Sequence, residues 1–91
     1  MKYHPYRTLE RMVRGFANHR RIQILELLKE HPELSVEQIA SHLKINYKTA
    51  AEHVRRLAIA GLVLKRNELH HVRHKLTARA LQVLKFLRTL E

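Results

Sequence analysis

The sequence contains no cysteine, no aspartate and no tryptophan, and it has only two glycines and two prolines among its 91 residues. Without cysteine there is no disulfide, thiolate zinc site or cysteine nucleophile, and without aspartate there is no Asp-based catalytic or magnesium site. The few hydroxyl side chains have no glycine-rich phosphate loop beside them. We therefore expect a protein that is not an enzyme and that needs no cofactor and no metal ion.

Long hydrophobic runs are also missing. The longest apolar stretch, Leu57 to Leu64, contains Gly61 and is far shorter than the roughly 20 residues of a membrane span. The first twenty residues contain several arginines and no continuous apolar core, so we expect no signal peptide. Since no segment has the composition of a linker and no internal repeat is present, residues 1–91 are predicted to form a single domain in the cytoplasm, with no membrane partner.

Positive charge is the dominant feature of the composition. Eighteen Lys and Arg residues oppose eight acids, which gives a formal net charge of +10. A small domain with this excess is suited to a polyanionic partner such as nucleic acid.

Apolar residues recur at helical spacing through the first two thirds of the chain. The predicted helices span residues 5–16, 20–30, 36–43 and 47–60. About three residues separate the third helix from the fourth, so these two must cross steeply, as in a helix-turn-helix.

Good capping residues precede three of these helices. Asn18 and Asn46 are suitable N-caps, and Ser35 with Gln38 forms a capping-box pattern. Pro5 suits the first position of the first helix, and Gly61 marks the end of the fourth.

After Gly61 the pattern becomes alternating. Two short strands are predicted at 62–66 and 69–76, with the turn at Asn67 and Glu68. A last helix follows over residues 77–90. The fold class is therefore mainly α with a small β-hairpin, a winged helix-turn-helix in the order α-α-α-α-β-β-α.

In a winged helix-turn-helix the second helix of the pair enters the major groove of DNA. Its inward positions are Ala50, Val54 and Leu57, and the opposite arc is free to reach base edges. The candidates for base readout are Tyr47, Lys48, Ala51, Glu52 and Arg55. Lys48 and Arg55 suit guanine, and Glu52 suits the amino group of cytosine.

Other polar residues of the helix-turn-helix and the hairpin suit phosphate contacts, which fix register without reading sequence. These candidates are Lys44, Asn46, Thr49, Arg56, Lys65, Arg66, His71, Arg73 and Lys75.

The last helix has apolar residues on more than one face, although a monomer buries only one. We expect the first helix, about 5–16, and the last helix, about 77–90, to form a homodimer interface. Its candidate residues are Tyr6, Leu9, Val13, Leu81, Leu84, Phe86, Leu87 and Leu90. The alternative is one broad stripe that faces the core of a monomer.

Several histidines, and two arginines of the first helix, also have candidate roles. His70 and His74 share a strand face but lie roughly 13 Å apart, so we expect them to pack beneath the wing and not to bind metal. His53, beside the inward stripe of the fourth helix, is expected to be structural. Arg11 and Arg14 either pair with acids such as Glu10 or extend the cationic rim toward flanking DNA.

The chain resembles the ArsR-like winged-helix regulators over about residues 9 to 85. The resemblance rests on the order and spacing of several segments: Asn18-His19-Arg20-Arg21-Ile22, Ile24 to Leu28, Leu34-Ser35-Val36, Ile39-Ala40, His53-Val54, Ala60-Gly61-Leu62-Val63 and Val72 to Thr77. It implies a cytoplasmic, nucleoid-associated prokaryotic regulator of transcription. It also implies a homodimer, formed through the first and last helices, on an operator with dyad symmetry.

Two departures from the family pattern are informative. Lys44 stands where the turn often has glycine, at a cost of about 1 kcal/mol if its backbone is left-handed. The metal sensors of the family use Cys in the third helix or Asp and His on the last helix, and this chain has none of these. We therefore do not expect metal sensing.

The sequence thus predicts a sequence-specific regulator that binds double-stranded DNA as a homodimer. The alternative is a winged-helix module for non-specific DNA or RNA binding or for protein assembly. The operator, the regulated genes, activation or repression and any effector are left open.

Overall fold

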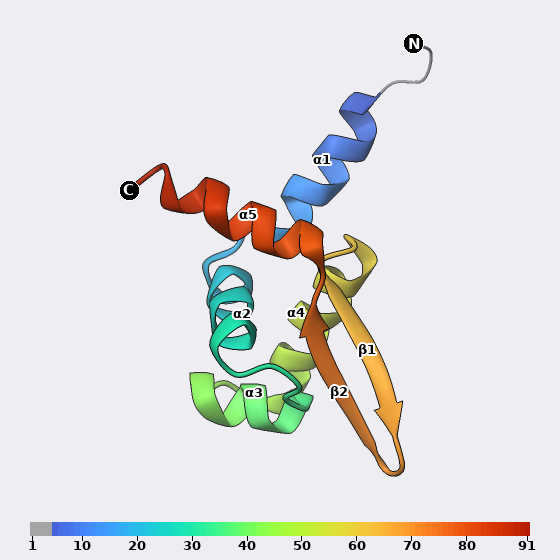
Figure 1. Ribbon diagram of the computed structural model, residues 1–91. Helices are drawn as coiled ribbons and strands as arrows, with labels where there is room; N and C mark the ends of the chain where they lie inside the picture. The colour runs from blue at the N-terminus through green and yellow to red at the C-terminus, as the bar shows by residue number, and fades with distance from the viewer. Residues whose placement is uncertain (1–4) are drawn as a thin grey trace.

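Residues 5–91, which the computed structural model describes, form five helices and one two-stranded antiparallel sheet (Figure 1). The elements are α1 (Pro5–Phe16), α2 (His19–Glu30), α3 (Val36–Leu43), α4 (Tyr47–Ile59), β1 (Val63–Glu68), β2 (His71–Leu76) and α5 (Ala78–Arg88). Their order confirms the predicted winged helix-turn-helix. No helix within these residues is long and apolar enough to cross a bilayer.

The helices begin where the sequence offers an N-cap. The side chains of Asn18 and Asn46 accept hydrogen bonds from backbone N–H groups in the first turns of α2 and α4. Ser35 and Gln38 form the predicted capping box at the start of α3, and Thr77 caps α5. Each cap satisfies a backbone donor that has no partner within its own helix.

The core is centred on α2. Helix α2 contacts α1, α4, α5 and β2, and its buried side chains belong to one core cluster with Ile39 of α3 and Val63 of β1. The largest fully buried apolar residues are Ile24, Leu25, Leu28, Ile39, Leu57, Leu62 and Val54. The broad apolar arc predicted for the second helix is therefore confirmed.

The elements divide the molecule into two ends. Figure 1 shows α1 and α5 at one end, and α3 and the tip of the hairpin at the other. Helix α4 connects the two ends, because it contacts α3 and also packs against the end of α1. At that second contact Gly15 of α1 lies directly against Ala60, the residue that follows α4.

The hairpin turn is not where the sequence predicted it. The turn lies at Leu69 and His70, and Asn67 is paired within the sheet opposite Val72. This register places Val63 opposite Leu76, so both point into the base of the wing, where Val63 is buried. Burial at the base sets the register and overrides the turn preference of Asn67. Leu69 takes the left-handed conformation instead, with φ of 55°.

His74 attaches the wing to the loop between α2 and α3. Its backbone N–H donates to the Leu34 carbonyl, its carbonyl accepts from the Glu33 N–H, and its Nδ1 lies 2.8 Å from the Leu34 oxygen. Because the side chain is only 1% exposed, it packs beneath the wing as predicted. His70 does not: it lies in the turn and is exposed, because the turn falls later than expected.

A second histidine, His53, takes part in a hydrogen-bonded link between α1, α2 and α4. The Nε of Arg21 donates to Nδ1 of His53 at 3.2 Å, and its Nη1 donates to the carbonyl oxygens of Arg14 and Gly15 at the end of α1. Arg21 of α2 thus joins α1 to α4 and closes the last turn of α1. The structural role predicted for His53 is confirmed.

Both of these histidines should make folding sensitive to acid. Burial lowers the pKa of His74 and of His53, and the nearby charge of Arg21 lowers that of His53 further. The folded state therefore favours the neutral rings. The free energy of unfolding should be at its full value above the ordinary histidine pKa, near 6.5, and should fall as the pH drops below it.

Urea unfolding at about pH 7.5 and about pH 5.5 checks this prediction. The double variant His53→Gln, His74→Gln should lose most of the pH dependence, because glutamine can replace both hydrogen bonds without titrating. His71→Gln, on the exposed part of the wing, should retain it. An unchanged slope in the double variant would contradict the assignment.

Because Gly15 lies against Ala60, the effect of Gly15→Ala on stability should be opposite to the effect expected from helix propensity. Replacing a helical glycine by alanine usually stabilises a protein by roughly 0.5–1 kcal/mol. At Gly15 the added Cβ would collide with the Cβ of Ala60, so Gly15→Ala should destabilise the protein by about 1–3 kcal/mol.

A double-mutant cycle measured by urea denaturation tests the contact. The combination of Gly15→Ala with Ala60→Gly should recover most of the lost stability, since it removes the colliding methyl group. A neutral or stabilising effect of Gly15→Ala alone would show that α1 and α4 do not pack this closely.

Candidate nucleic-acid interface

The helix-turn-helix is formed by α3, α4 and the short connection at Lys44, Ile45 and Asn46. Lys44 has φ of 57° and ψ of 46°, which is the left-handed conformation considered in the sequence analysis. A non-glycine residue there costs about 1 kcal/mol, and the fold accepts this cost. The Lys44 side chain is exposed at the turn, and the oxygen of the Asn46 side chain accepts from the Thr49 N–H at 2.8 Å.

Helix α4 presents two distinct faces. Ala50, Val54 and Leu57 are at most 1% exposed, as predicted for the inward stripe. On the opposite arc Tyr47 is 55% exposed, and Lys48, Glu52 and Arg55 are exposed too. Ala51 differs from these four, since it is half-buried at the edge of the arc nearest the wing.

Glu52 is already paired within the helix. Its two carboxylate oxygens accept from Nε and Nη2 of Arg55 at 2.9 and 3.0 Å, and one of them also accepts from Nε of Arg56 at 2.8 Å. These bonds lower the pKa of Glu52 to about 2. The predictions for Glu52 and Arg55 treated each side chain alone, although the spacing of three and four residues is the known signal for such pairs.

Acids also hold two of the wing arginines. Arg66 pairs with Glu33 at 2.9 Å and with Glu68 at 3.6 Å, and Arg73 pairs with Glu68 at 2.7 Å. Arg73 additionally donates to the Glu33 carbonyl at 3.2 Å. The cross-strand register brings Arg66 and Arg73 opposite each other on the outer face of the wing, where two like charges need these acids. Neither Glu33 nor Glu68 was among the predicted site residues, and no local spacing identifies Glu33.

The lysines are different. Within residues 5–91, none of the four candidate lysines has a carboxylate within ion-pair distance; these are Lys44, Lys48, Lys65 and Lys75. These four lysines can therefore bind an external anion without losing an internal partner. His71 and Thr49 are also exposed.

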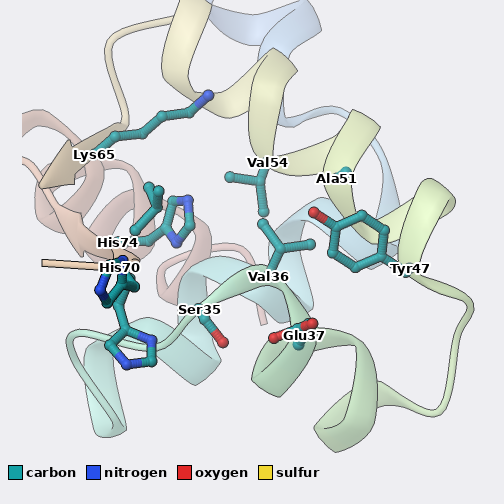
Figure 2. Close-up of a pocket in the computed structure, with 11 residues that line it drawn as sticks. Ser35, Val36, Glu37, Tyr47, Ala51, Val54, Lys65, His70 and His74 are labelled. Atoms are coloured by element: carbon teal, nitrogen blue, oxygen red, sulfur yellow. The ribbon is translucent and has the colours of Figure 1, made fainter. Parts of the chain in front are cut away.

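A groove of about 370 Å³ separates the first half of α4 from the wing. Figure 2 shows Tyr47, Ala51 and Val54 on the α4 side, with Lys65, His70 and His74 on the wing side. Lys65 lies on the inner face of the wing because it is paired opposite His74. His71 and Val72 of the wing, with Ser35, Val36 and Glu37 at the start of α3, complete the lining. The groove therefore joins the arc of α4 to the wing in one concave surface.

The histidines of residues 5–91 are not gathered into a metal centre. Among the described residues, no group of three His or Glu side chains is placed to hold an ion. His74 uses its Nδ1 on the Leu34 carbonyl, and His53 uses its Nδ1 on Arg21.

An exposed apolar surface covers α1 and α5 at the other end of the molecule. The large apolar side chains with roughly half or more of their area exposed there are Tyr6, Leu9, Val13, Leu81, Phe86 and Leu90. A shallow groove between the two helices contains Val13, Phe16 and Phe86. Two of the residues predicted for an interface lie deeper: Leu87 is half-buried, and Leu84 is 3% exposed in the core of the protomer. Leu84 thus supports this surface from beneath.

Comparison with known proteins agrees with this geometry. Residues 18–65, more than half of the chain, match the family of bacterial regulatory proteins called the arsR family. No curated protein sequence matches the chain.

Three solved structures are similar over most of the chain. A homodimeric winged helix-turn-helix DNA-binding domain from Mycobacterium bovis, described as a possible ArsR-family transcriptional regulator, is 28% identical with a TM-score of 0.85 and covers 93% of this chain and 79% of that one. The transcriptional regulator HlyU from Vibrio vulnificus is 30% identical with a TM-score of 0.74, covering 90% and 85%. HlyU from Vibrio cholerae is 28% identical with a TM-score of 0.81, covering 99% and 97%.

The fold, the exposed arc beside a basic wing and these matches agree. The chain belongs to the arsR family of bacterial regulatory proteins and is a winged helix-turn-helix DNA-binding regulator of transcription.

Proposed function

We propose that this protein is a sequence-specific regulator that binds double-stranded DNA as a homodimer, on an operator with dyad symmetry. The observation that carries the proposal is the separation of two surfaces on one small domain. The exposed arc of α4 and the wing lie at one end, and the exposed apolar side chains of α1 and α5 lie at the other. A dimer through the second end leaves both copies of the first end free for DNA.

In the proposed complex α4 enters the major groove with its first turns. Tyr47, Lys48 and Ala51 contact base edges directly. Arg55 and Glu52 read bases only after their mutual hydrogen bonds are exchanged for hydrogen bonds to DNA, since both partners are engaged in the free protein. The half-buried Ala51 offers its methyl group, which suits contact with the methyl group of thymine.

The flanking contacts are to phosphates. Residues around the turn and on the wing would hold the protein in register on the backbone: Lys44, Asn46, Thr49, Arg56, Lys65, Arg66, His71, Arg73 and Lys75. The unpaired lysines can bind phosphates without first breaking an internal ion pair. This function places the protein on chromosomal DNA in the cytoplasm of a prokaryotic cell.

Dimerisation supplies the symmetry. Helices α1 and α5 would pack against the same helices of a second copy, so that the two α4 helices lie about one turn of DNA apart, roughly 34 Å. The apolar side chains exposed on these helices in the single chain support this arrangement, because a monomer would leave them in water. A homodimer is also what is described for the similar domain from Mycobacterium bovis.

Selection from a pool of random duplexes, at moderate salt and with competitor DNA, tests base reading. We expect a motif with dyad symmetry. On that motif Lys48→Ala and Arg55→Ala should weaken specific binding about five- to hundredfold and non-specific binding much less, because each removes a contact to a base.

Lys75→Ala is the matched control for Lys48→Ala, as both remove one unpaired lysine. It should weaken specific and non-specific binding about equally. Retention of duplexes without any motif, or equal losses for all three variants, would overturn base reading. A module for non-specific nucleic-acid binding or protein assembly would then be favoured.

Sedimentation tests the dimer. Phe86→Glu and Leu81→Glu, at exposed positions of α5, should convert a dimer into a folded monomer, because each would bury an unpaired carboxylate at the interface. Leu64→Glu, equally exposed but on the wing, should leave the dimer intact. Leu84→Glu should unfold the protein instead. A wild-type monomer at about 10 micromolar would contradict the dimer.

A further inference from the structure

Four arginines converge where the end of α4 meets the end of α1. Arg11 and Arg14 of α1, Arg21 of α2 and Arg56 of α4 line a pocket of about 240 Å³. Gly15, Ile59 and Ala60 complete its lining. No carboxylate is among these seven residues, so the lining carries four positive charges. We call this site the arginine pocket.

The close approach of α1 to α4 creates the pocket. Because Gly15 has no side chain, the last turn of α1 rests directly against Ala60, and the arginines on either side of this contact are brought together. Arg21 lies in a fixed position, since its Nε and Nη1 donate to His53, Arg14 and Gly15. A guanidinium held in this way loses little freedom when it binds a ligand.

Most of the remaining guanidinium donors are free. Arg56 uses only its Nε on Glu52 within hydrogen-bond distance. The nearest acid to Arg14 is Glu10 at 3.5 Å, and both side chains are more than half exposed. Arg14 thus follows the first of the two alternatives in the sequence analysis. Arg11 has no ion pair among residues 5–91.

The chemistry of the pocket selects its ligand. Several guanidinium groups around one cavity match the geometry and charge of phosphate oxygens, and an anion there would relieve the mutual repulsion of the arginines. Residues of α1, α2 and α4 line this partly open pocket, whose volume is large enough for a small anion. We propose that the arginine pocket binds a small anion that bears a phosphate group.

The position of the pocket separates this ligand from DNA. Its α4 residues, Arg56 and Ile59, lie toward the end of the helix, whereas Tyr47 and Lys48 lie in the first turn, about 12 to 18 Å away along a helix that rises 1.5 Å per residue. The wing groove contains none of the four arginines. The site shares Arg56 with the residues proposed to contact phosphates, but it lies apart from the wing groove and from the first turn of α4.

Inorganic phosphate is the probe for this proposal. Phosphate added in exchange for chloride at constant ionic strength should shift the amide resonances of Gly15, Ile59 and Ala60 along saturable curves and should raise the melting temperature. In the double variant Arg11→Gln, Arg14→Gln, half-saturation should need about tenfold more phosphate. Both side chains are exposed, so the variant should fold, which its melting temperature in chloride verifies.

The matched control removes the same charge elsewhere. Lys29→Gln combined with Lys85→Gln takes away two exposed lysines that do not line the pocket, and it should bind phosphate as the wild type does. Shifts that do not saturate, or that weaken equally in the control, would reduce the effect to net charge and overturn the proposal.

A DNA arm distinguishes the two sources of phosphate. In chloride buffer the Arg11→Gln, Arg14→Gln variant and the lysine control should bind a duplex of about 20 base pairs with affinities within about twofold of each other. A loss of more than tenfold in the arginine variant alone would assign the pocket to flanking DNA and overturn the small-anion proposal. Phosphate binding is measured without DNA, so its failure is separate from a failure of the proposed function.

Discussion

The packing of one stripe of α4 is the constraint on which the rest of the molecule depends. Ala50, Val54 and Leu57 are buried against the core that α2 organises, and their burial fixes how far α4 is rotated about its own axis. A rotation that exposed these residues would cost several kcal/mol, since burial of Val54 and of Leu57 contributes about 1.5–3 kcal/mol each. The orientation of the exposed arc of α4 is therefore determined by the buried stripe on its opposite face, and not by contacts that the arc itself makes.

Helix α4 also connects the α1 end of the molecule mechanically to the end formed by α3 and the wing. Its first turns meet α3 and the wing groove, and its last turn meets α1 across Gly15 and Ala60. Arg21 and His53 add a hydrogen-bonded connection between α1, α2 and α4. A displacement of α1, for instance at a dimer interface, must therefore move α4 or break this packing. Such a connection would carry a signal received at α1 to the DNA-facing end of α4.

Local signals in the sequence predicted most of the fold. The caps at Asn18, Ser35 and Asn46 and the apolar periods located the helices within a residue or two, because both signals act within one or two turns. The hairpin register depended on which residues the core buries, so the turn at Leu69 could not be read from Asn67. The candidate site was predicted as a set of exposed residues. Its ion pairs divide into local ones, such as Glu52 with Arg55, and distant ones, such as Glu33 with Arg66.

The internal ion pairs also bear on how the protein responds to salt. Binding to DNA gains entropy when condensed cations leave the phosphates, and the gain depends on how many phosphates the protein neutralises. Arg55, Arg56, Arg66 and Arg73 already share Glu33, Glu52 and Glu68, so each of these arginines that turns to a phosphate leaves a carboxylate near the same backbone. The number of counterions released is then set mainly by the lysines. We therefore expect the protein to release fewer counterions on binding DNA than its 18 Lys and Arg residues alone suggest.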